Sequence, residues 1–143
     1  MIHGQRSNIL RLLLNYCDAI KAISELSRVL KSNGIMILEF ESSEGFEYLG
    51  KKEYKMPATV ITLEYMHEQH TQWLFSQKYV YNILKEYDFR IIEKYPFHIL
   101  DGILSKFLNE TLSVKLTSID KFINQWPFFR KHGNNIIVLC TKN

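Results

Sequence analysis

Residues 18–39 constrain the fold most strongly, because an amphipathic helix there leads directly into a buried strand. The apolar residues of the helix, expected over about 18–31, repeat at spacings of three and four and share one face: Ile20, Ile23, Leu26 and Leu30. Asp18 can cap the first turn, and the Ser-Asn-Gly at 32–34 supplies the left-handed exit that ends a helix. The apolar run at 34–40 predicts a strand covered on both faces, which is typical of parallel α/β sheets.

The rest of the chain alternates in the same way. Ser76 can cap a second helix over 77–87, and a strand is expected over 90–97. A helical region follows, and the apolar run within 134–142 predicts a last buried strand. Two further segments have a less defined pattern. Residues 9–15 could be the tail of a strand or a short helix, and residues 58–63 could be a short strand or an extended cover segment. This order of elements predicts an α/β layer architecture.

Length and composition favour an ordinary soluble domain. We expect the 143 residues to form a single domain, 1–143, with residues 1–8 poorly ordered. No apolar stretch approaches the roughly 20 residues that span a bilayer, and two distant cysteines suggest no disulfide framework, so a reduced, cytoplasmic setting fits. The net charge of +3 is too small to indicate nucleic-acid binding by itself. Two local basic clusters, at 51–55 and 130–132, are interpreted mainly as solvated loop and helix ends.

Several phrases resemble those of class I S-adenosylmethionine (SAM) dependent methyltransferases of the type 11 and type 12 kind. Glu25, Arg28-Val29-Leu30-Lys31 and Ser32-Asn33-Gly34 are similar to the E-x-x-R-V-L-K-P-G-G phrase before the family's fifth strand. The segment at 12–23 resembles the one after the fourth strand, 76–97 resembles the helix and strand numbered six, and 133–143 resembles the seventh strand. The likeness covers roughly residues 10–143 in the family's order.

The resemblance implies a partial Rossmann-like α/β fold: a mixed sheet with strands in the order five, seven, six, the last antiparallel, plus flanking helices. It covers only the carboxyl-terminal half of the family. The family holds SAM mainly through a glycine-rich turn in its first half, and no two of this chain's six glycines form a G-x-G. We therefore expect no cofactor-binding residues here and little or no SAM binding by this chain alone.

The resemblance also suggests where a small-molecule acceptor lies. Residues 70–76 resemble an H-x-x-x-F-S/T phrase that borders the acceptor pocket, so His70 and Trp73 are candidate substrate-binding residues, and His98 could face the same pocket. Packing, turn and exposed-loop roles are the alternatives for these three. His67 and His70 are three apart, whereas the zinc-peptidase pattern needs four, so no metal site is expected. No catalytic residue can be assigned.

Three functions remain open on the sequence. The first is a methyltransferase in which an acceptor oxygen, nitrogen or carbon attacks the methyl group of SAM in line. The second is a non-catalytic, truncated fold remnant, or a complementing half that associates with an upstream half-domain or with itself through an open strand edge. The third and weakest is a nucleic-acid module that uses the lysines at 51–55.

Overall fold

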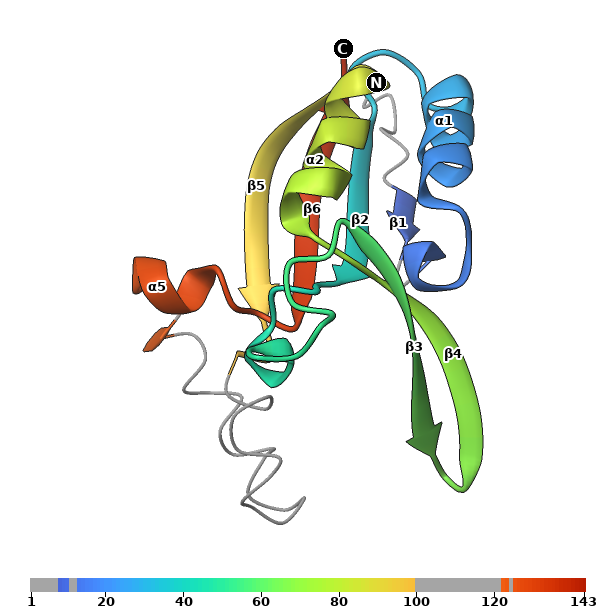
Figure 1. The fold of residues 1–143 in the computed structure, drawn as a ribbon. Coiled ribbons are helices and arrows are strands. Elements are labelled where there is room, and N and C mark those ends of the chain that lie inside the picture. Colours follow the sequence, from blue (N-terminus) through green and yellow to red (C-terminus); the bar gives the residue numbers. More distant parts are fainter. Residues whose placement is uncertain (1–7, 11–12, 100–121, 124) are drawn as a thin grey trace.

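A four-stranded mixed sheet forms the centre of the molecule (Figure 1). The computed structural model describes residues 8–10, 13–99, 122–123 and 125–143. The sheet has the order β1-β2-β6-β5, built from β1 (Asn8–Leu10), β2 (Ile35–Glu41), β6 (Asn135–Lys142) and β5 (Phe89–Phe97). β1 is parallel to β2, whereas β6 lies between β2 and β5 and is antiparallel to both.

One residue of the amino-terminal segment 1–8 is described. Asn8 belongs to β1, whose three residues pair with Met36–Leu38 of β2. The expectation that residues 1–8 are poorly ordered stays a prediction. The segment after β1 contains a 3-10 helix, η1 (Leu13–Tyr16). Residues 1–7 lie outside the described residues, and so do residues 100–121 and 124 of the helical region expected over about 100–126.

The first helix, α1 (Ala19–Val29), begins and ends close to the predicted points. The Asp18 carboxylate accepts hydrogen bonds from the Ile20 and Lys21 backbone N–H groups, at 3.0 and 3.1 Å. Leu30 is extended, so the helix stops two residues earlier than predicted, and Asn33 adopts the left-handed conformation with φ of 61°. Lys142 Nζ, from the last strand, donates to the carbonyls of Ser27 and Leu30 and satisfies this helix end.

The second helix, α2 (Gln77–Glu86), confirms the prediction of a capped amphipathic helix. The Ser76 hydroxyl accepts a hydrogen bond from the Tyr79 N–H at 3.2 Å. Val80, Ile83 and Leu84 are buried. Asp88 then takes φ of 64°, and this left-handed residue turns the chain into β5.

Burial on the sheet alternates, which corrects the expectation of a strand covered on both faces. Alternate residues of β2 and β6 are buried in one cluster with apolar residues of α1 and α2: Met36, Leu38, Phe40, Ile136, Val138, Cys140, Ile23, Val80 and Leu84. Their neighbours on the other face, including Ile37 and Leu139, are only half-buried. The reason is that both helices pack on the same face of the sheet.

A β-hairpin extends from the body of the molecule as an arm (Figure 1). It consists of β3 (Ala58–Tyr65) and β4 (Glu68–Phe75), joined by Met66 and His67, both with positive φ. Only the first of these strands was anticipated from the sequence. A short helix, η2 (Phe46–Tyr48), precedes the arm, and another, α5 (Pro127–Arg130), precedes β6. Within the described residues, no helix is long and apolar enough to cross a membrane.

Candidate functional site

The carboxyl ends of β1 and β2 meet at one edge of the sheet because these strands are parallel. In open α/β sheets, ligands bind outside such strand ends. β6 is antiparallel to β2, so its amino end and the segment before it reach the same edge. Three segments therefore gather here: η1, the loop that follows β2, and residues 126–134.

A buried polar cluster occupies this edge, formed by Asn15, Glu41 and Gln72. Asn15 is completely buried, and its Oδ1 accepts from the Glu41 backbone N–H at 3.1 Å. Its Nδ2 donates to Glu41 Oε2 at 3.3 Å, and the Gln72 amide, from the hairpin arm, donates to the same oxygen. The Tyr48 hydroxyl lies 3.5 Å from Glu41 Oε1. We call these four residues the carboxylate cluster.

Burial raises the pKa of the Glu41 carboxyl to about 7, and the negative charge of Glu47 adds to the shift. The hydrogen bonds from Gln72 and Tyr48 act in the opposite direction but only partly offset it. Burial also raises the pKa of Tyr48, so its phenol stays protonated. Glu41 is thus a half-buried carboxyl whose pKa lies near neutral, at a sheet edge where ligands of related architectures bind.

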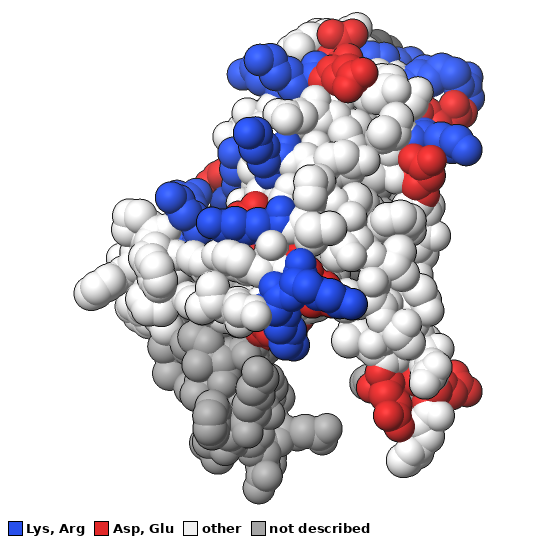
Figure 2. Space-filling model, in the orientation of Figure 1, with Lys and Arg blue, Asp and Glu red and all other residues white. Residues whose placement is uncertain are grey.

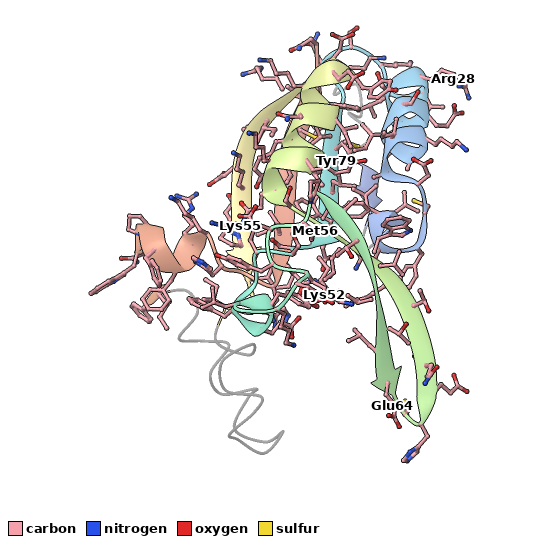
Figure 3. The ribbon with its side chains drawn as sticks, viewed as in Figure 1. Arg28, Lys52, Lys55, Met56, Glu64 and Tyr79 are labelled. Carbon is pink, nitrogen blue, oxygen red and sulfur yellow. The ribbon has the colours of Figure 1, made fainter. Side chains whose placement is uncertain are left out.

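An open groove of about 790 Å³ lies between the loop after β2, the start of α2 and the end of α5, and none of the four residues of the carboxylate cluster lines it. A second hollow of about 470 Å³ continues it along α2, and the two share Glu44, Lys55, Lys78 and Asn82. Figure 2 shows Lys and Arg side chains gathered on this face of the molecule, while acidic side chains mark the tip of the hairpin arm. Lys55 and Lys52 come from the loop below α2 (Figure 3). We call this feature the basic groove.

His132 forms part of the wall of the basic groove and is held by both ring nitrogens. Nδ1 lies 2.8 Å from the Phe128 carbonyl oxygen, which can only accept, so Nδ1 carries the hydrogen. In the neutral ring this leaves Nε2 as the acceptor for the Tyr54 hydroxyl, 3.1 Å away. The ring also stacks on Phe46, with centroids 4.6 Å apart. The His132 ring is therefore held in a fixed orientation in the wall of the basic groove.

The residues predicted to bind substrate lie in two separate places. His70 and Trp73 are on β4, in the hairpin arm, where the alternation of side chains puts them on opposite faces of the strand. His70 Nε2 is 3.8 Å from the Glu68 carboxylate, and Trp73 stacks on Phe75. His98 follows β5, with a left-handed backbone and its ring 4.7 Å from that of Phe97. The arm and the end of β5 are on different sides of the molecule in Figure 1, and the substrate-binding roles stay predictions.

Sequence reasoning missed the carboxylate cluster but flagged parts of the basic groove. Glu41 did have one signal, since an acidic residue directly after a buried strand marks a strand end, whereas Gln72 had none. The two basic clusters were treated as unrelated surface features. The fold brings Lys55 of the first and Lys131 and His132 of the second to the same groove.

The described side chains and backbone bear on two kinds of site, a metal site and a SAM cradle. Within the described part of the chain, no three His, Cys, Asp or Glu side chains are placed to hold a metal ion. A Cβ on Gly45 would lie 2.3 Å from Asn134 Oδ1, and one on Gly133 would lie 2.7 Å from Pro96 Cβ. These glycines permit close packing of the chain on itself. Neither forms an open cradle for the methionine part of SAM, and the expectation that this chain alone binds little or no SAM stays a prediction.

The sheet, with helices on its face and an antiparallel strand returning between two others, is the architecture of part of a SAM-dependent methyltransferase. No protein-family model matches the sequence, and no curated protein matches it. Solved structures do match. A provisionally assigned SAM-dependent methyltransferase from Listeria monocytogenes matches with a TM-score of 0.61 at 12% identity, over 96% of this chain and 61% of that one.

Further solved structures agree. A SAM-dependent methyltransferase from Mesorhizobium loti matches with a TM-score of 0.53 at 11% identity, over 95% of this chain and 61% of that one. The glycopeptide N-methyltransferase MtfA, in complex with S-adenosyl-L-homocysteine, matches with a TM-score of 0.55 at 13% identity, over 96% of this chain and 54% of that one. The chain therefore has a partial methyltransferase fold and spans little more than half the length of these proteins.

Proposed function

We propose that this chain forms the acceptor side of a class I SAM-dependent methyltransferase that acts on a small molecule. The observation that carries the proposal is the position of β6, antiparallel between β2 and β5, with β1 parallel on the far side of β2. Equating β2, β6 and β5 with the family's fifth, seventh and sixth strands gives the order that the sequence resemblance implies. β1 then corresponds to the end of the fourth strand.

In this proposal, SAM and the acceptor are bound by different parts of the sheet and its loops. SAM is held by a glycine-rich half that this sequence does not contain, in a cytoplasmic setting. Residues 41–75 and 97–130 shape the acceptor side, and His70, Trp73 and His98 remain candidate contacts. Glu41 lies at the carboxyl end of β2, where a carboxyl with a pKa near 7 can accept a proton from a bound acceptor group.

A hybrid protein tests the proposal. The part of MtfA that this chain does not match is joined ahead of residue 8, and SAM is titrated into the hybrid and into the 143-residue chain by calorimetry. The hybrid is expected to unfold cooperatively and to bind SAM at micromolar concentrations, whereas the chain alone binds little or none. The family resemblance implies a glycine-rich turn in the added part, and a matched hybrid with valine in place of a glycine of that turn should lose the binding. A hybrid that folds without binding SAM, or that does not fold as one unit, contradicts the proposal.

A second candidate is a non-catalytic role in which the chain pairs with another polypeptide through its open edge. It is favoured by the short ladder at that edge, since among the described residues β1 pairs with three of the seven residues of β2, Met36, Ile37 and Leu38. Such an edge invites a further strand, from an upstream half-domain or a second copy. Light scattering after size exclusion distinguishes the candidates, because a monomer at all concentrations, with slow amide exchange throughout β2, argues against self-association.

A further inference from the structure

The basic groove has the form of a small-molecule site. It runs from Tyr54 and Lys55, in the loop after β2, past Lys78 in the first turn of α2, to Lys131 and His132 ahead of β6. Its volume, about 790 Å³, is within the range of sites for small ligands. The three segments that form it all lie at the sheet edge where β2 ends.

Positive charge in the groove exceeds negative charge. Lys55, Lys78 and Lys131 line it, together with a single carboxylate, Glu44. The Glu44 Oε1 atom already accepts a hydrogen bond from the Gln77 N–H, at 3.3 Å. Among the described residues, the ion pairs join Lys21 to Asp18, Arg28 to Glu25, Lys52 to Glu53 and His70 to Glu68. The three groove lysines therefore have no carboxylate partner in the described part of the chain.

Two more cations lie next to residues of the groove without lining it. Lys94 Nζ lies 3.9 Å from the centroid of the Tyr81 ring, which lines the groove. Burial lowers the pKa of Lys94, and the positive charge of Arg130 lowers it further. These two charges add to the positive potential around the groove, which favours an anion.

Part of the groove wall is made of aromatic rings. Tyr54 and His132 are nearly parallel, with an interplanar angle of 8°, and are joined by their hydrogen bond. Phe128 lies 5.0 Å from the His132 ring and also lines the groove. Since these rings hold one another in place, they offer a rigid surface on which a ring of the ligand can pack at low entropic cost.

We propose that the basic groove binds a small anion that carries an aromatic ring, with the phosphate or carboxylate group against Lys55, Lys78 and Lys131 and the ring against Tyr54 and Phe128. As an acceptor site for methyl transfer, the groove rests on the proposed function. As a binding site it stands on its own geometry, and it is tested without SAM.

Titrations of the 143-residue chain, followed by backbone amide NMR shifts, test the proposal. Phenyl phosphate and benzoate are the probes, and phenol and inorganic phosphate supply the ring and the anion separately. At least one of the two aryl anions is expected to bind at millimolar concentrations or better, at least about tenfold more tightly than phenol or phosphate because both parts contribute. The tighter of the two identifies the anionic group. Shifts should be centred on Tyr54, Lys78 and His132.

Single substitutions assign the binding to the groove. Lys55→Gln, Lys78→Gln and Lys131→Gln should each weaken the aryl anion about three- to fivefold, as for an exposed charge interaction. Lys85→Gln, on the same helix two turns beyond Lys78, is the matched control and should leave binding unchanged. Equal binding of phenol, absence of aryl-anion binding, or an equal loss with Lys85→Gln would overturn the proposal. None of these outcomes bears on the SAM titration of the hybrid.

Discussion

Asn15 holds Glu41 at two points, through the backbone and through the side chain. Its Oδ1 accepts from the Glu41 N–H at 3.1 Å, and its Nδ2 donates to the carboxylate at 3.3 Å. These two residues come from the segments that follow β1 and end β2, so their contact ties together the two parallel strands at the edge where we place the acceptor. Both the stability of the fold and its response to pH should depend on this pair.

Glu41 should make the protein less stable as pH rises. Its pKa is about 7 in the folded protein and 4.5 as the reference value for the unfolded chain, so the folded state binds more protons between these pH values. The contribution of Glu41 to the free energy of unfolding is therefore largest below pH 4.5. It decreases by up to about 3 kcal/mol as the pH rises from 4.5 through 7. Urea unfolding at pH 5, 6, 7 and 8 measures the effect.

Glu41→Gln should remove most of this slope and should raise stability relative to the natural protein at pH 8. Glu64→Gln, at the exposed tip of the hairpin arm, is the control and should leave the slope unchanged. If the difference in stability between Glu41→Gln and the natural protein is the same at pH 5 and pH 8, the shifted carboxyl is assigned to the wrong residue.

Asn15→Ala should destabilise the fold by about 1 to 3 kcal/mol, because it leaves a buried N–H and a buried carboxylate oxygen with one partner fewer. Asn82→Ala, at an exposed position of α2, removes the same side chain without a buried contact and should change stability little. Chemical denaturation of the two variants makes the comparison. Equal effects would mean that the Asn15 hydrogen bonds contribute no stability.

The helices and the long strands of the main sheet could be predicted because their signals are local. Asp18 and Ser76 cap the helices that they were predicted to cap, and the apolar runs correspond to β2 and β6. The coverage of the sheet could not be predicted in this way. Whether one face or two are buried depends on which side the helices pack, and the sequence of one strand does not contain that information.

The hairpin arm and the contacts of the candidate site could not be predicted from the sequence, because they join residues that are far apart in the chain. β4 has the sequence EQHTQWLF, whose polar first half gives no strand pattern, and it is extended because it pairs with β3 across a tight turn. Glu41 meets Asn15 and Gln72 across 26 and 31 residues of sequence, and Tyr54 meets His132 across 78. Such pairs become visible only when the fold is known.

Asp88 should accept glycine more readily than a β-branched residue. It adopts φ of 64°, which costs an ordinary residue about 1 to 2 kcal/mol. Asp88→Gly should stay within about 1 kcal/mol of the natural protein, since relief of strain and greater freedom of the unfolded chain oppose each other. Asp88→Val should destabilise by more than that.

The control for this series is Lys85→Gly, inside α2, which should cost about 1 kcal/mol because glycine is a poor helix former. Thermal unfolding of the three variants gives the ranking. A valine at position 88 that is tolerated as well as glycine would contradict the left-handed turn between α2 and β5.

Leu38 should be far more important for stability than an exposed leucine of the arm. It is completely buried between the sheet and the helices, so Leu38→Ala should cost about 2 to 5 kcal/mol. Leu63→Ala, on β3, removes a side chain that is 41% exposed and should cost less than about 1 kcal/mol. Urea unfolding measures the free energy of unfolding of both variants. A similar loss in the two would mean that Leu38 is not part of the core.

Amide hydrogen exchange of the isolated chain, read residue by residue by NMR, tests the central claim most directly, because the proposal rests on β6 lying inside the sheet. A central strand bonds every N–H to a neighbour, whereas in an edge strand alternate N–H groups face solvent. We predict slow exchange at every residue from Ile136 to Cys140 and alternating fast and slow exchange along β5. Alternation within β6 would make it an edge strand and would contradict the methyltransferase account.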